Sequence, residues 1–134
     1  MDVTPILEPL NEPQRMAVTG NNEPMLIIAG AGSGKTRVLT HRIAWLIKIE
    51  NLSPHDLLAV TFTNKAAKEM KDRVENLLQM PVHNLWIGTF HGLAHRFLRR
   101  HTEDISLDKN FQIIDSDDQL RIIKRLFKNQ NLDE

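Results

Sequence analysis

The sequence predicts an α/β fold in which helices cover a parallel β-sheet. Three short apolar runs, each too brief for a core helix, are expected to form strands at residues 25–29, 57–62 and 85–88. Longer segments with apolar residues at helical spacing lie between and after these runs. Strands that alternate with helices in this way form a parallel sheet with right-handed crossover connections.

Two short helices are expected before the first strand. Thr4 followed by a proline is typical of an N-cap and a first helical position, and it predicts one helical turn to about residue 7. The second helix should run to about residue 18, with Asn11 as its cap. Gln14 stands three residues after that cap, where a capping-box partner belongs.

Four longer helices are expected after the first strand. The first repeats apolar residues at positions 39, 43, 46 and 47 and should end near residue 49. The second should run from about residue 64 to the proline at position 81, and Thr89 can cap the third, which should reach about residue 100. Ser116 and Gln119 form a capping-box pattern for the fourth, whose apolar face is expected at positions 120, 123, 126 and 127.

Composition excludes several classes of protein. The 134 residues contain no cysteine, which excludes disulfides and thiolate chemistry, and 17 basic side chains balance 17 acidic ones. The N-terminus lacks the basic start and long apolar core of a secretory signal, and no apolar run approaches the length of a membrane span. We therefore expect a soluble, cytoplasmic protein with no membrane partner.

A glycine-rich turn follows the first expected strand, and the pair Lys35-Thr36 ends it. Glycines let successive backbone N–H groups turn inward, where they and the positive end of the following helix can hold an anion. Lys35 would reach the β- and γ-phosphates of a nucleotide, and the Thr36 hydroxyl would ligate Mg²⁺. Ala29 stands where the usual phosphate-loop pattern has its first glycine. The candidate nucleotide-binding residues of this loop are Ala29, Gly30, Ala31, Gly32, Ser33, Gly34, Lys35 and Thr36.

The ends of the other two expected strands share a composition. Residues 61–65 and 88–92 each place a phenylalanine among hydrogen-bonding side chains at a helix start. An aromatic face stacks on any base, and hydroxyl, amide and ammonium groups hold phosphates. The alternative interpretation is that both phenylalanines lie in the core and the polar residues only cap helices. The candidate residues for binding single-stranded nucleic acid are Thr61, Phe62, Asn64, Lys65, Thr89, Phe90 and His91.

Four segments together resemble a known family, the superfamily 1A DNA helicases of the UvrD/Rep/PcrA group. Residues 10–14, 29–36, 59–67 and 87–91 are similar, in order and spacing, to the Q motif and to motifs I, Ia and Ib of these enzymes. The family's phosphate loop commonly begins with Ala or Gly, so Ala29 fits it. The resemblance spans nearly the whole chain and implies a partial RecA-like P-loop NTPase sheet, followed by the start of a helical insertion. It places residues 1–89 in RecA-like domain 1A and residues 90–134 in the 1B subdomain, with the remainder of the helicase outside this chain.

The resemblance also implies an activity. The full protein would be an ATP-dependent 3′→5′ DNA helicase of excision or mismatch repair, using ATP and Mg²⁺. Its partners would be single-stranded DNA, duplex junctions and repair proteins. Lys35 and Thr36 would be catalytic, Gln14 would read the adenine edge, and Arg37 would lie against the adenine face. The alternatives are a capping-box role for Gln14 and a solvated helix position for Arg37.

The sequence lacks parts that such a motor needs. Phosphate transfer requires an acidic pair and arginines that stabilise the transition state. Residues 115–118 are the only acidic cluster that could serve, and we interpret them as a helix start, so this chain alone is expected to be inactive. Two rival functions are a small phosphotransferase, which should carry a basic lid, and a non-catalytic nucleotide-binding module, which should not respond to nucleic acid.

Overall fold

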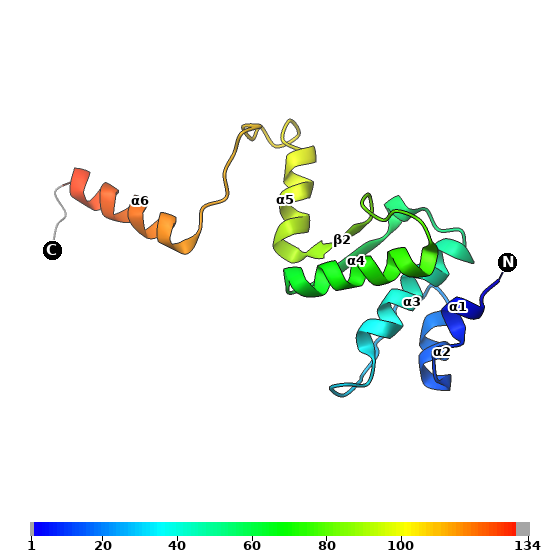
Figure 1. Ribbon diagram of the computed structural model, residues 1–134. Coiled ribbons are helices and arrows are strands. Elements are labelled where there is room, and N and C mark those ends of the chain that lie inside the picture. Colours follow the sequence, from blue (N-terminus) through cyan, green and yellow to red (C-terminus); the bar gives the residue numbers. More distant parts are fainter. Residues whose placement is uncertain (1, 131–134) are drawn as a thin grey trace. The chain divides into compact units, whose positions relative to one another are not determined.

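The computed structural model describes residues 2–130 and shows a mixed α/β structure (Figure 1). In chain order its elements are α1 (Thr4–Leu7), α2 (Glu12–Thr19), α3 (Lys35–Lys48), the 3₁₀ helix η1 (Pro54–Asp56), β1 (Leu58–Thr61), α4 (Asn64–Leu78), β2 (Trp86–Thr89), α5 (Phe90–Arg100) and α6 (Ser116–Asn129). The chain forms two compact units, and the boundary between them lies between Arg96 and Phe97. In the described part, no helix is long and apolar enough to cross a membrane.

The sheet consists of β1 and β2, which pair in parallel and are connected through α4. This confirms the second and third expected strands and the crossover helix between them. Thr61 and Thr89, the last residues of the two strands, are partners in the register. The segments that leave the carboxyl ends of β1 and β2 therefore start from the same edge of the sheet.

The strand expected at residues 25–29 is not formed, so that prediction was wrong. The side chains of Leu26 and Ile28 are 84% and 91% exposed. A parallel strand needs a neighbouring strand to pair its backbone groups and a packed layer to bury its side chains. Among residues 2–130 the sheet has only β1 and β2, and neither pairs with this segment.

The first unit packs around α3, which is buried on two faces. Ile43 belongs to one core cluster together with buried residues of β1, α4 and β2, such as Met70 and Ile87. Val38 and Ala44 belong to a second cluster that joins α3 to α1 and α2. Only one face had been expected, and Leu39, which was placed on it, is exposed. Other elements pack on two faces of α3 because its apolar and small residues cover more of its circumference than one apolar stripe would.

Side chains cap α2, α4 and α5, and the caps of α2 and α5 are those that the sequence predicted. Asn11 and Gln14 form the expected capping box of α2, in which each side chain bonds the backbone N–H of the other. Thr63 accepts a hydrogen bond from the N–H of Ala66 at the start of α4, and Thr89 accepts one from Gly92 in the first turn of α5. These bonds satisfy N–H groups that have no partner within the helix.

Two predicted caps were wrong by one residue: the cap positions are Val3 in α1 and Asp115 in α6. Asp115, not Ser116, caps α6 and accepts a hydrogen bond from the N–H of Asp118 at 2.8 Å. Thr4 is the first residue of α1 rather than its cap, and its N–H donates to the carboxylate of Asp2. Hydrogen bonds from Thr4 lower the pKa of Asp2. In both places a carboxylate, the stronger acceptor, lies just before the expected cap.

The second unit begins within the last turn of α5 and contains the connection that follows and α6. Arg99 lies over the ring of Phe111, 4.6 Å from its centroid, and donates to the Phe111 carbonyl oxygen. The expected apolar face of α6 is present on the helix, and its residues are exposed in the described structure; they are Leu120, Ile123, Leu126 and Phe127.

The core packing predicts a matched pair of stability effects. Met70→Ala should lower the free energy of unfolding by about 2–5 kcal/mol, because it removes a buried side chain and leaves a cavity between α4 and the sheet. Met16→Ala, on the exposed side of α2, should change it by less than about 0.5 kcal/mol. Urea denaturation of the two variants measures both values, and equal losses would contradict the core described here.

Candidate functional site

The loop before α3 has the backbone of an anion site. Gly32 and Gly34 have φ values of +74° and +85°, in the left-handed region that glycine adopts without strain. Gly34 is the N-cap residue of α3, so Lys35 and Thr36 form the first turn of that helix. The first N–H groups of a helix have no partner within it, and the helix dipole makes this end positive. A phosphate bound in the loop would contact the unpaired N–H groups and lie at the positive end of the helix dipole.

Lys35 holds the loop together. Its ammonium donates to the carbonyl oxygens of Ala29 and Gly30 at 3.1 and 2.6 Å, and the Ser33 hydroxyl donates to the same Gly30 oxygen at 2.7 Å. The positive charge of Lys35 is therefore kept within the glycine-rich turn rather than extended into solvent. An anion that entered the loop would be attracted to this charge as well as to the helix end.

Gln14 connects α2 to this loop. Its amide nitrogen donates to the Ser33 carbonyl oxygen at 3.1 Å, while its oxygen accepts the capping hydrogen bond from the N–H of Asn11 at 3.1 Å. An amide group has two N–H donors and two acceptor lone pairs, so Gln14 keeps one of each for a ligand. The φ of +85° at Gly34 is a conformation that other residues rarely adopt, and a Cβ atom there would also lie 2.8 Å from the Gln14 nitrogen.

An open pocket of about 390 Å³ lies where these elements meet. It is lined by Gln14, Gly32, Ser33, Gly34, Lys35, Thr36, Arg37 and Arg73. The structure thus gathers seven of the residues predicted to bind nucleotide around one space. Ala29, Gly30 and Ala31 belong to the same loop but do not line this pocket, and Arg37 also lies 3.4 Å from the carbonyl oxygen of Pro9, to which it donates.

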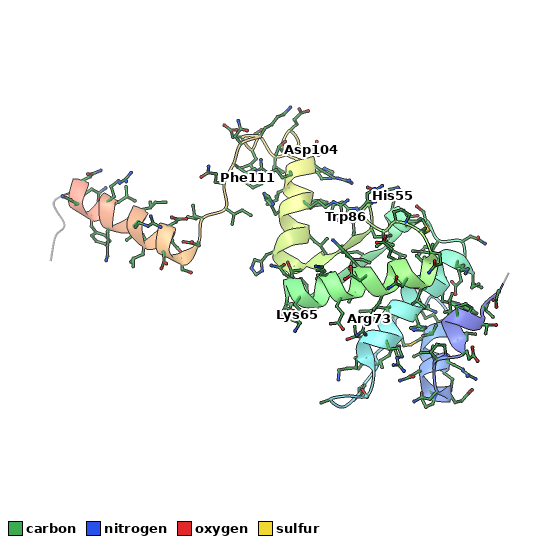
Figure 2. All side chains as sticks on the ribbon, in the orientation of Figure 1. His55, Lys65, Arg73, Trp86, Asp104 and Phe111 are labelled. Carbon is green, nitrogen blue, oxygen red and sulfur yellow. The ribbon has the colours of Figure 1, made fainter. Side chains whose placement is uncertain are left out.

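Arg73 is the pocket residue that sequence reasoning missed. It projects from α4 (Figure 2), and it forms an ion pair with Glu69, one turn earlier in that helix. Such an i,i+4 pair is an ordinary feature of a solvated helix surface, so it carries no signal of a site. Arg73 reaches this pocket only because α4 packs against α3.

The two aromatic residues at the strand ends lie together on the surface. The ring centroids of Phe62 and Phe90 are 5.4 Å apart and the rings are tilted by 52°. Phe62 is 88% exposed and Phe90 is 55% exposed, so neither is a core residue. They meet because each ring follows one of the paired strand ends, at Thr61 and Thr89.

A groove of about 360 Å³ adjoins the aromatic pair, between α4, β2 and α5. Asn64 and Thr89 line it, whereas Lys65 and His91 lie exposed on the first turns of α4 and α5. Lys68 and Lys71 also line the groove, and sequence reasoning did not select them. With Asn64 they recur at intervals of four and three residues, which places all three on one face of α4.

Asp72 also lines the groove, but no metal-binding cluster accompanies it in the described part of the chain. Within residues 2–130, no three His, Cys, Asp or Glu side chains lie close enough together to hold a metal ion. The cluster at residues 115–118 opens α6, with Asp115 as cap, which confirms its interpretation as a helix start.

The chain is similar to known proteins over nearly its whole length. Residues 10–134 match the model of the UvrD/REP helicase N-terminal domain. DNA helicase II of Escherichia coli (strain K12) is 58% identical over 134 residues, which cover 100% of this chain and 19% of that protein. The ATP-dependent DNA helicase PcrA of Bacillus subtilis (strain 168) is 51% identical over 128 residues, which cover 96% of this chain and 17% of that protein. The chain thus spans about a fifth of the length of these relatives, and it belongs to the UvrD/REP helicase N-terminal domain family.

Proposed function

We propose that this chain is the ATP-binding N-terminal part of an ATP-dependent DNA helicase. The pocket that joins Gln14 of α2 to Lys35 and Thr36 of α3 carries this proposal. It combines donors suited to an adenine edge with a loop and a helix end suited to phosphates. The relatives named DNA helicase II and ATP-dependent DNA helicase PcrA support the same assignment.

The residues of the pocket fit a magnesium nucleotide. Lys35 would hold the β- and γ-phosphates and withdraw charge from the transferring group. The Thr36 hydroxyl would be one protein ligand of Mg²⁺, an ion that prefers oxygen and takes its remaining ligands from phosphates and water. Arg37 and Arg73 add two cations at the rim of the pocket. Bound Mg²⁺ would supply the charge that stabilises the leaving phosphate oxygen.

Single-stranded DNA would pass over the aromatic pair. Phe62 and Phe90 present exposed ring surface on which bases can stack without regard to sequence. Thr61, Asn64, Lys65, Thr89 and His91 lie within three residues of one phenylalanine or the other along the chain and offer donors for phosphates. ATP and DNA would bind to elements that pack against one another through α3 and α4. A change in this packing on ATP binding would therefore also change the affinity for DNA.

The proposal includes a place in a larger protein. Residues 1–89 would form the first part of RecA-like domain 1A, and residues 90–134 would begin the helical 1B subdomain. The full helicase would move 3′→5′, act at duplex junctions in excision or mismatch repair with other repair proteins, and work in the cytoplasm. A phosphotransferase or a purely nucleotide-binding module would leave the exposed aromatic pair without a role.

Removal of the Lys35 ammonium tests the phosphate site. In the full-length helicase, Lys35→Ala should lower DNA-stimulated ATP hydrolysis by about 10²-fold or more, because the transferring phosphate loses a preorganised charge. Lys124→Ala, an exposed lysine of α6, is the matched control and should retain activity. Phosphate release measures both, and circular dichroism shows whether the fold persists. Near-normal turnover by Lys35→Ala would contradict the assignment.

Substitution of Gln14 tests adenine recognition. Gln14→Ala should weaken ATP binding about tenfold and weaken CTP binding less, since only the adenine edge loses paired contacts. Gln119→Ala on the exposed surface of α6 is the control. Titration calorimetry with both nucleotides gives the ratio. If ATP and CTP weaken equally, Gln14 acts only as a cap and a loop contact.

Truncation of the aromatic pair tests the nucleic-acid surface. Phe62→Ala and Phe90→Ala should each weaken binding of single-stranded DNA by about 1–3 kcal/mol, the value of one stacked base. Phe127→Ala, an exposed phenylalanine of α6, should leave the affinity unchanged. Fluorescence anisotropy at several salt concentrations measures it, and the two strand-end variants should keep the salt slope because they remove no charge. Unchanged affinity in both would exclude the pair from the DNA site.

A further inference from the structure

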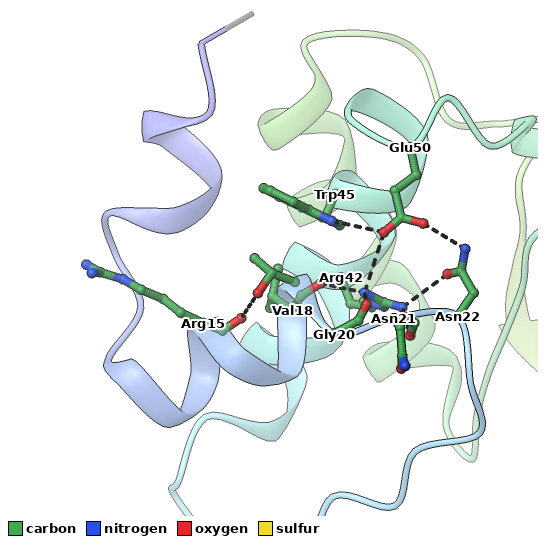
Figure 3. A network of polar contacts seen from close by, with 9 residues as sticks. Arg15, Val18, Gly20, Asn21, Asn22, Arg42, Trp45 and Glu50 are labelled. Atoms are coloured by element: carbon green, nitrogen blue, oxygen red, sulfur yellow. Dashed lines mark hydrogen bonds and ion pairs between the residues drawn. The ribbon is translucent and has the colours of Figure 1, made fainter.

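The guanidinium of Arg42 in α3 donates hydrogen bonds to the end of α2 and to the segment that follows it (Figure 3). One terminal nitrogen of its guanidinium donates to the carbonyl oxygens of Val18 and Gly20, at 2.7 and 2.5 Å. The other donates to the carbonyl oxygen of Asn21 at 2.9 Å and to the side-chain oxygen of Asn22 at 3.3 Å. The four N–H groups of these two nitrogens are thus matched by four acceptors, and the side chain is only 17% exposed.

These contacts supply what α2 lacks at its C-terminus. The last carbonyl groups of a helix have no partner within it, and a positive charge beside them is favourable. The last turn of α2 contains no basic residue of its own. A helix of eight residues is also too short to be stable alone, so its position depends on tertiary contacts. Arg42 provides both the charge and the hydrogen bonds from a neighbouring helix.

A second set of contacts orients the guanidinium. Asn22 donates from its amide nitrogen to Glu50 at 2.8 Å, and the indole N–H of Trp45 donates to the other Glu50 oxygen at 3.2 Å. Arg42 and Glu50 are also an ion pair at 4.0 Å. Figure 3 shows how these side chains surround the turn after α2. The turn after α2 is therefore bonded both to Arg42 and, through Asn22, to Glu50.

The same two helices carry the proposed nucleotide site. Gln14 lies in the first turn of α2, and Arg42 holds the other end of that helix. Lys35 begins α3, about two turns before Arg42. The separation between the group that would read adenine and the loop that would hold the phosphates is thus set by how α2 is fixed on α3. A hydrogen bond to a base edge tolerates little displacement, whereas phosphate attraction tolerates more.

We propose that Arg42 is a positioning residue for adenine recognition: it fixes α2 on α3 so that Gln14 meets the base while the phosphates lie in the loop. This inference rests on the proposed nucleotide site. The two terminal nitrogens of Arg42 form a planar fork of donors. Lysine in its place keeps the charge but presents three donors on one nitrogen, which cannot reproduce this fork. Loss of the fork should therefore reduce selectivity for adenine more than it reduces phosphate binding.

Three ligands separate these effects in the full-length protein: ATP, CTP and inorganic triphosphate, each titrated by calorimetry. Arg42→Lys should lower the ratio of ATP to CTP affinity about tenfold and leave triphosphate affinity unchanged. Asn22→Ala removes one acceptor from an exposed turn and should lower the ratio by a smaller factor. Arg125→Lys, on the exposed surface of α6, is the matched control and should keep the wild-type ratio.

The outcomes distinguish this inference from the proposed function. If the wild-type protein discriminates ATP from CTP and both network variants keep that ratio, Arg42 has no positioning role. If Arg42→Lys loses ATP, CTP and triphosphate alike while Asn22→Ala changes nothing, its role is general stability and the inference is overturned. If the wild-type protein itself shows no preference for ATP, the adenine site is refuted and this inference with it.

Discussion

The burial of α3 on two faces is the constraint on which the rest of the first unit depends. Ile43 packs into the cluster that contains α4 and both strands, and Val38 and Ala44 pack into the cluster formed with α1 and α2. The glycine-rich loop ends where α3 begins, so every element packed on α3 is positioned relative to Lys35. The candidate site is thus built on a packed helix and not on a free loop, which is what precise binding requires.

Polar contacts between distant segments complete this arrangement. The buried His41 of α3 donates from Nδ1 to the carbonyl oxygen of Ile6 at 2.6 Å, which secures α1. Arg42 secures the end of α2 and Gln14 secures its beginning. In each case a side chain satisfies a backbone group that a short helix or turn leaves without a partner. Two helices that would be marginal in isolation are therefore fixed on α3, and one of them, α2, contributes Gln14 to the pocket.

Charge in this protein acts through its distribution. Basic and acidic side chains are equal in number, so no global field attracts nucleic acid or nucleotide. Basic side chains are instead gathered locally: Lys35, Arg37 and Arg73 at the pocket, and Lys68 and Lys71 in the groove between α4, β2 and α5. Short-range contacts with phosphates depend on such local groups far more than on net charge.

The sequence by itself determined the local features: the glycine loop with Lys35, the capping box at Asn11, both paired strands, and the aromatic residues at the strand ends. These follow from backbone preferences and side-chain bonds within a few residues, which a local pattern contains. It failed at residues 25–29, because an apolar run predicts burial but cannot supply the neighbouring strand that burial needs. Only the tertiary structure brought Arg73 to the pocket, Arg42 to the end of α2, and the two phenylalanine rings within 5.4 Å of each other. Those contacts join residues far apart in the chain, and they depend on how the helices pack against one another rather than on any pattern along the sequence.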